Sequence, residues 1–302
     1  MAVRFRVVIA AVAALIPLVA ACASSSSSSG DAHGRIRVVA STDVYGDIAA
    51  TIAGDHGDVT SFIDEPDQDP HSYEANARNQ LAVGKADLII ENGGGYDDFV
   101  DRLRSASDTR AAVVNVVKLS GKTASAGGEL NEHVWYDLPT VAKLAGQLAT
   151  SFAALQPDHA AQFRANARSF TAGLSTLERT EAQVKAAAGG AGVAITEPVP
   201  LYLLQACGLV NRTPAAFSEA VEEGTDVSAA VLNETLGLFR AHTVSALVYN
   251  AQTSGPETTK VIAAAKAAGI ATVAVTETLP ADTHYLTWMR ANLAAVRAAV
   301  AK

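Results

Sequence analysis

The stretch DHAAQFRANARSFTAGLSTLERTEAQVKAAA, residues 158–188, decides the fold of this chain. Its large apolar residues recur at helical spacing: Phe163, Phe170, Leu174, Leu177 and Val184. Pro157 suits a helix start, Gly189 suits a helix stop, and Gly173 is the only glycine between them. We therefore expect one helix of about thirty residues, roughly 45 Å long at 1.5 Å per residue. A helix of that length can connect two lobes.

The segments on both sides of this helix alternate between short β-branched runs and alanine-rich helical stretches. Strands are predicted at Ile36–Ser41, Val59–Ile63, Asp87–Glu91, Val113–Val116, Val193–Thr196, Ser245–Asn250 and Ala271–Thr276. Helices are predicted at Val44–Ala53, Glu74–Gly84, Tyr96–Ser105, Thr140–Leu155, Val227–Ala241, Pro256–Ala268 and Thr283–Ala301. This order indicates an α/β fold of two lobes, residues 35–157 and 190–302, each with a parallel sheet flanked by helices and joined by one long rigid helix over 158–189.

The first 34 residues have the character of a targeting segment. Residues 1–21 combine an early positive charge with an apolar run of about fifteen residues, which is short for a membrane-spanning helix and typical of a secretion signal. Small residues precede Cys22, as in a bacterial lipobox, so we expect lipid attachment at Cys22. Residues 22–34, with six consecutive serines, then form a flexible tether. An ordinary signal with a chance cysteine is the alternative.

Composition narrows the class of protein. The 302 residues are 49% hydrophobic, which is ample for a packed core, and the formal net charge is −8. An acidic chain without a basic run is a poor candidate for nucleic-acid binding. Two cysteines exclude a disulfide scaffold, and Cys207, inside an apolar run, is expected to be buried.

Candidate ligands for a metal ion follow the predicted strands. His71 ends the loop of residues 64–71 that follows the strand Val59–Ile63, Glu197 and Glu277 directly follow predicted strands, and His133 stands before a helix. Ligands of open α/β sheets bind outside the carboxyl ends of the strands, so two imidazoles and two carboxylates there suit zinc or manganese. Each residue also has a structural interpretation: a solvated turn for His71, a packed histidine for His133, and helix or turn caps for the glutamates.

Several motifs together resemble the metal-binding solute-binding lipoproteins of zinc and manganese ABC importers. They are the Cys22 lipobox, DPHSYE at 69–74, ADLIIENG at 86–93, NEHVW at 131–135, YNAQT at 249–253 and YLTWM at 285–289. The resemblance covers residues 35–302. It implies two α/β lobes joined by a rigid helix, with one metal ion per chain in the cleft between the lobes. It also implies that His71, His133, Glu197 and Glu277 hold this ion.

Two positions differ from the common pattern of that family. Glu197 stands where members have either histidine or glutamate, but the Pro198-Val199-Pro200 that follows departs from the common His-x-Ala-Phe pattern, and Glu277 stands where the family usually has aspartate. Residues 121–130 contain no histidine, whereas many zinc-type members carry a histidine-rich loop there. A carboxylate-rich set favours manganese, although affinity for such sites rises toward zinc. Neutral histidines are required for binding, so affinity is expected to fall below about pH 6.

The resemblance also implies the partners and the location of the chain. It predicts a monomer, lipid-anchored outside the cytoplasm at the periplasmic face or the cell surface, that delivers Zn²⁺ or Mn²⁺ to a membrane permease with a cytoplasmic ATPase. No phosphate-binding loop of an ATPase occurs in this chain, and capture rather than catalysis is expected. Asn250 and Gln252, at another strand end, are candidates to orient the ligands.

Three other classes of protein remain open at this stage. A metallohydrolase would need an open metal position and a general base, and the sequence has no His-Glu-x-x-His helix. A binding protein for a siderophore or a cobalamin-like ligand would use Arg, Tyr or Trp in the cleft. An adhesin or structural lipoprotein would bind no metal ion.

Overall fold

The computed structural model describes residue 1, residues 34–65, residue 68, residues 73–124 and residues 129–301. Residues 35–302 form one compact unit. The predicted signal segment, Cys22 and His71 lie outside the described residues. No helix among the residues described is both long enough and apolar enough to cross a membrane.

The first sheet contains the strands that the sequence predicts before the long helix. Its order is β2-β1-β3-β4 and all its strand pairs are parallel. The strands are β1 (Ile36–Thr42), β2 (Gly57–Ile63), β3 (Leu88–Glu91) and β4 (Ala112–Asn115). Strand β3 is buried along its whole length, which explains its continuously apolar sequence.

The second sheet repeats this arrangement with the order β6-β5-β7-β8, again entirely parallel. The strands are β5 (Gly192–Ile195), β6 (Val210–Asn211), β7 (Ala246–Asn250) and β8 (Ala271–Val275). Strand β6 pairs only two residues with β5 and is the one described strand that the sequence pattern did not predict. The two sheets confirm the predicted α/β class.

Helices flank both sheets. Those before the long helix are α1 (Asp43–Ala53), α2 (Ala77–Lys85), α3 (Asp98–Ser105), α4 (Val116–Ser120) and α5 (Leu138–Leu155). Those after it are α7 (Leu201–Ala206), α8 (Ala215–Glu222), α9 (Ala229–Arg240), α10 (Pro256–Ala267) and α11 (Tyr285–Val300). Short 3₁₀ turns occupy Gly54–His56, Val134–Tyr136 and Pro157–His159.

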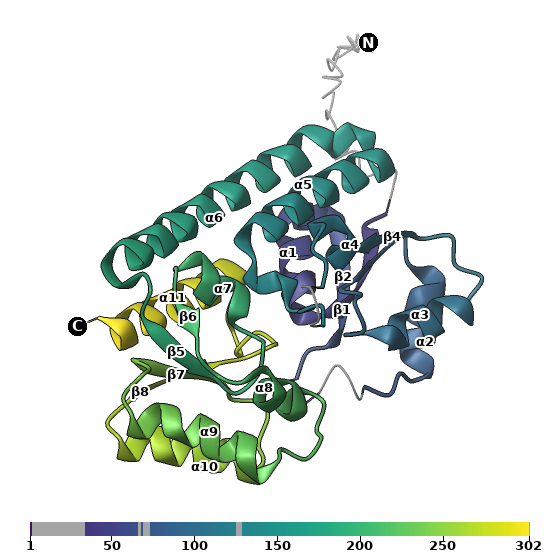
Figure 1. Ribbon diagram of the computed structural model, residues 1–302. Helices are drawn as coiled ribbons and strands as arrows, with labels where there is room; N and C mark the ends of the chain where they lie inside the picture. The colour runs from purple at the N-terminus through teal and green to yellow at the C-terminus, as the bar shows by residue number, and fades with distance from the viewer. Residues whose placement is uncertain (2–33, 66–67, 69–72, 125–128, 302) are drawn as a thin grey trace. The chain divides into compact units, whose positions relative to one another are not determined.

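The long helix is α6 (Ala160–Ala188), with 29 residues. It runs past both sheets (Figure 1) and contacts α1 and α5 of the first half of the chain and α7 and α11 of the second. The predicted apolar residues of this helix are all buried. The long helix that the sequence predicts is therefore confirmed, and it begins with a 3₁₀ turn at Pro157.

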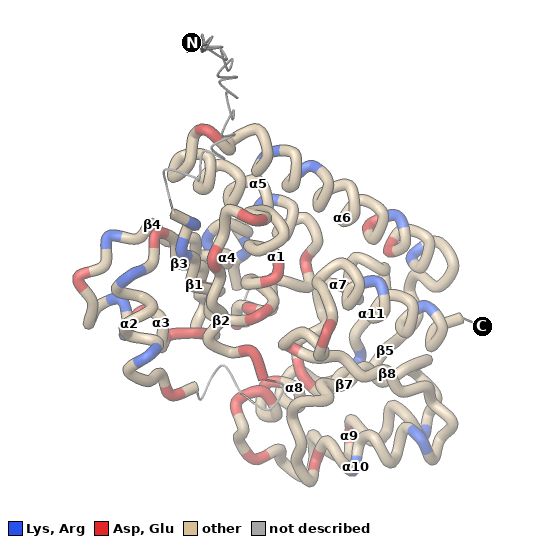
Figure 2. The backbone as a smooth tube through the Cα atoms, turned by 180° about the vertical axis from the view of Figure 1, so that it is seen from behind, with Lys and Arg blue, Asp and Glu red and all other residues tan. Residues whose placement is uncertain are grey.

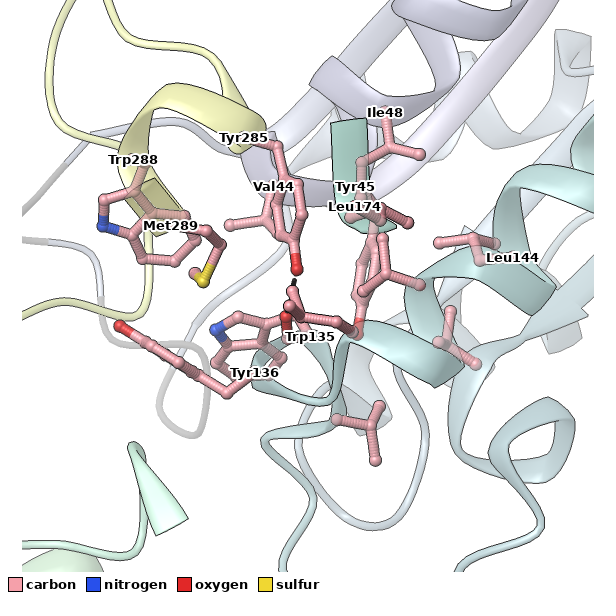
Figure 3. Packing of buried hydrophobic residues seen from close by; sticks show 14 of the residues in the cluster. Val44, Tyr45, Ile48, Trp135, Tyr136, Leu144, Leu174, Tyr285, Trp288 and Met289 are labelled. Atoms are coloured by element: carbon pink, nitrogen blue, oxygen red, sulfur yellow. Dashed lines mark hydrogen bonds between the residues drawn. The ribbon is translucent and has the colours of Figure 1, made fainter. Parts of the chain in front are cut away.

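One hydrophobic cluster continues from the first sheet to the second through α6. It includes Tyr45 of α1, Leu174 of α6 and Met289 of α11, all at most 1% exposed. Figure 3 shows these side chains packed around Trp135, and the hydroxyl of Tyr285 donates a hydrogen bond of 2.6 Å to the Trp135 carbonyl. Because the core is continuous, the segment that contains His133 is held against both halves of the chain.

Candidate metal centre

The ends of several strands and one turn of the first half meet in a cleft of about 840 Å³. Most of its lining residues, from both halves of the chain, are glutamates and glycines: Gly94, Gly95, Glu129, Leu130, Glu132, Glu197, Val221, Glu222, Glu223, Gly224, Thr253 and Glu277. Figure 2 shows acidic segments gathered near α8. Six carboxylates at one cleft create a strongly negative potential, which attracts cations.

His133 is fully buried beside this cleft, at the start of the turn Val134–Tyr136. Its Nδ1 atom lies 2.7 Å from Oδ1 of Asn131, and its backbone N–H donates to the same oxygen. An imidazole that donates from Nδ1 presents the lone pair of Nε2 when it is neutral. The Nε2 atom faces carboxylates, 3.1 Å from Oε1 of Glu222 and 3.7 Å from Oε2 of Glu277.

The pKa of His133 lies well above its usual value. Burial alone lowers this pKa, but the charges and hydrogen bonds of Glu222 and Glu277 outweigh burial. A cation in front of Nε2 would replace the proton and meet the same carboxylates. The surroundings of His133 therefore favour positive charge at this point.

Glu277 follows β8 and is held by polar groups from both halves of the chain. Asn250, at the end of β7, donates to its Oε1 over 2.7 Å, and Tyr96 donates to its Oε2 over 3.1 Å. Its backbone N–H donates to Oε1 of Gln252 over 2.5 Å. Asn250 and Gln252 thus hydrogen-bond to Glu277, and the role predicted for them, to orient a ligand, stays a prediction.

Glu197 follows β5 and is 2% exposed. Neither of its carboxylate oxygens has a hydrogen-bond partner of good geometry among the described residues. Burial, together with the charges of Glu222 and Glu277, raises the pKa of Glu197 to about 7, although hydrogen bonding from Asn250 and Thr253 acts to lower it. A buried carboxylate without hydrogen bonds of good geometry is costly, and a bound cation would supply a closer partner.

Three of the four predicted ligands thus belong to one neighbourhood. His133 and Glu277 lie in contact. Glu197 lines the same cleft, and the charge of Glu277 raises its pKa. The assignment of His71 as a ligand stays a prediction, because this residue lies outside the described part of the chain.

Sequence reasoning missed two carboxylates at this site. Glu222 ends α8, and Glu132 precedes His133; the three residues offer ligand atoms that all lie within 4.8 Å of one another. The signal for Glu132 was its place in the NEHVW motif. For Glu222 the signal was the segment from Pro214 to Gly224, whose proline start and glycine stop are typical of a short helix.

The sequence profile of the ZnuA family, described as zinc-uptake complex component A, periplasmic, matches residues 38–299. Among curated proteins, the manganese-binding lipoprotein MntA of Bacillus subtilis is 27% identical over 152 residues, which are 49% of this chain and 49% of that protein. The chain thus spans about half the length of the curated relatives that it matches.

Solved structures resemble the fold over most of its length. The periplasmic zinc-binding protein TroA of Treponema pallidum superposes with a TM-score of 0.72 at 20% identity, covering 89% of this chain and 100% of that one. The binding protein FpvC of Pseudomonas aeruginosa in complex with Mn²⁺ gives 0.71 at 22% identity, covering 88% and 98%. At these identities the likeness shows the fold.

Proposed function

The chain belongs to the family of periplasmic zinc-uptake complex component A, and on that premise we propose that it captures one Zn²⁺ or Mn²⁺ ion and delivers it to an ABC import permease driven by a cytoplasmic ATPase. The carrying observation is the buried Glu197 carboxylate, whose oxygens have no hydrogen bond of good geometry among the described residues, in the same cleft as an imidazole whose Nε2 faces carboxylates. These groups require a cation to balance them.

The proposed ligands are His71, His133, Glu197 and Glu277. Two nitrogens and two carboxylates form a set that both zinc and manganese accept. Asn131 fixes the ring of His133, while Asn250 and Tyr96 fix the carboxylate of Glu277. With four protein ligands the site is closed to substrate water, which favours capture over hydrolysis.

The location follows from the same proposal. The segment 1–21 directs export, a lipid at Cys22 holds the protein at the outer side of the membrane, and residues 22–34 act as the tether. The name of the Bacillus subtilis relative, a lipoprotein, supports this assignment. We further propose that the protein acts as a monomer, and that the two lobes are residues 35–157 and 190–302.

The test is a calorimetric titration of metal-stripped protein with Zn²⁺ and with Mn²⁺. We expect one ion per chain, and sharply weaker binding in the single variants His71→Ala, His133→Ala, Glu197→Ala and Glu277→Ala. His242→Ala is the matched control, because this exposed histidine follows α9 and lies outside the cleft. A folded wild type that binds neither ion would refute the proposal and direct attention to organic ligands.

A further inference from the structure

Glu222 makes the shortest described contact to the metal-facing nitrogen of His133. Its Oε1 atom lies 3.1 Å from Nε2, closer than the 3.7 Å of Glu277. The Glu222 side chain is only 13% exposed, and the ligand atoms of Glu132, His133 and Glu222 lie within 4.8 Å of one another. Because metal–ligand bonds are about 2.0–2.3 Å long, one ion can contact all three atoms after small side-chain movements that draw them closer together.

Helix α8 holds Glu222 in this position. A second hydrophobic core, separate from the one around Trp135, includes Phe217, Phe239, Leu247 and Val261; Phe217 anchors the helix there with 0% exposure, and Ser218 is also buried. The helix ends at Glu222; Gly224, two residues on, adopts a φ of 63°, and the backbone N–H of Thr225 donates a hydrogen bond of 2.8 Å to the Ala220 carbonyl. Glu222 is therefore a fixed residue of the cleft and not a mobile surface side chain.

The negative charge of the cleft supports a role for Glu222 as a further ligand. Glu222 and Glu277 bring two carboxylates to the imidazole of His133, and Glu197 lines the same cleft, 98% buried and with no donor of good geometry to either oxygen among the residues described. A divalent ion at His133 would meet Glu222 first, because that carboxylate is the nearest to Nε2. Without a bound cation, the negative charges of Glu222 and Glu277 repel that of the buried Glu197 carboxylate, which is costly at such burial.

We propose that Glu222 is an additional ligand of the captured ion, a third carboxylate that joins Glu197 and Glu277. This inference rests on the proposed function. It also concerns metal choice, because manganese accepts more oxygen ligands in a larger coordination shell, whereas zinc is satisfied by four ligands. Glu222 therefore contributes more to the binding of Mn²⁺ than to that of Zn²⁺.

The experiment compares Glu222→Gln with Glu223→Gln in the full chain. Both variants remove one negative charge from the cleft, but Glu223 is exposed and makes no described contact with His133. Metal-stripped wild type and both variants are titrated with MnCl₂ and with ZnCl₂, and circular dichroism checks their folding. Glu222→Asp, which keeps the charge but shortens the side chain, is the second variant.

We expect Glu222→Gln to lose at least about 10-fold in Mn²⁺ affinity, since even groups that only orient ligands are worth about 10–100-fold. The loss for Zn²⁺ should be smaller, and Glu223→Gln should bind both ions nearly as the wild type does. Glu222→Asp should be weakened as well, because its carboxylate falls short of the ion.

Two results would overturn the inference while the proposed function stands. One is equal binding by Glu222→Gln and Glu223→Gln when His133→Ala abolishes binding. The other is tighter binding by Glu222→Gln, which would make Glu222 a competitor of the metal for His133. Failure of the folded wild type to bind either ion would instead overturn the proposed function and the inference together.

Discussion

Asn131 fixes His133 with a single oxygen, which lies 2.7 Å from the ring Nδ1 and 3.1 Å from the backbone nitrogen. The side-chain amide N–H of Asn131 also donates to the Pro198 carbonyl over 3.1 Å, and the backbone carbonyl of Asn131 accepts a hydrogen bond of 2.7 Å from the Tyr202 hydroxyl. Asn131 therefore links the histidine of the first half to the loop that follows Glu197 in the second.

Replacing Asn131 by alanine should weaken metal binding by about 10–100-fold, because the ring of His133 loses the acceptor that sets its orientation. Asn131→Asp keeps that acceptor and should retain more affinity. Isothermal titration with Zn²⁺ measures both variants. Equal affinity of Asn131→Ala and wild type would show that packing alone orients His133.

Asn250→Ala removes the hydrogen bond of 2.7 Å that Asn250 donates to Oε1 of Glu277. We expect about a 10-fold loss of metal affinity, since the carboxylate then has more freedom. Asn233→Ala, at an exposed position of α9, is the control. If both variants bind metal as the wild type does, Asn250 has no part in orienting Glu277.

Glu181, in the long helix, should make stability depend on pH. It is 6% exposed, its Oε1 has no hydrogen-bond partner among the described residues, and burial raises its pKa from 4.5 to about 7. The folded state thus binds the proton more tightly than the unfolded state, so stability declines as pH rises from about 4.5 to about 7.

Glu181→Gln resembles the protonated side chain and should therefore raise the free energy of unfolding at pH 8 by about 1–3 kcal/mol. At pH 4.5 it should differ little from the wild type. Urea unfolding at both pH values measures this, with Glu234→Gln in α9 as an exposed control. An equal effect at both pH values would argue against a buried, titrating Glu181.

Asp47 of α1 caps the last helix, α11. Its carboxylate accepts from the Tyr285 backbone N–H over 2.8 Å and lies 2.6 Å from Nδ1 of His284. Asp47→Ala should destabilise the fold by about 1–2 kcal/mol through loss of the cap. His284→Ala should cost much less, because the His284 side chain is 81% exposed. Thermal unfolding compares the two, and equal destabilisation would contradict the capping role.

The sheets were predictable because buried parallel strands are continuously apolar. The strand expected at Asp87–Glu91 appears as β3, and the long helix was predictable from its spacing and its flanking proline and glycine. Helix α2 begins at Ala77 and not at Glu74, because the Asn76 side chain caps it by accepting from two backbone N–H groups.

Elements fixed by tertiary packing were not predictable in the same way. Helices α7 and α8 are short, and α8 is held mainly by the burial of Phe217 in the second hydrophobic core. For that reason the sequence did not predict Glu222 as a residue of the site, since its place beside His133 depends on how α8 packs. Glu197 and Glu277, by contrast, follow strands directly and could be found from strand ends alone.

The most direct test of the central claim is a crystal structure of the protein soaked with Zn²⁺ or Mn²⁺, with anomalous diffraction recorded at the edge of that metal. The account predicts one strong peak in the cleft, about 2.0–2.2 Å from Nε2 of His133 and from oxygens of Glu197 and Glu277. A peak confined to another part of the surface, with the cleft empty, would contradict it.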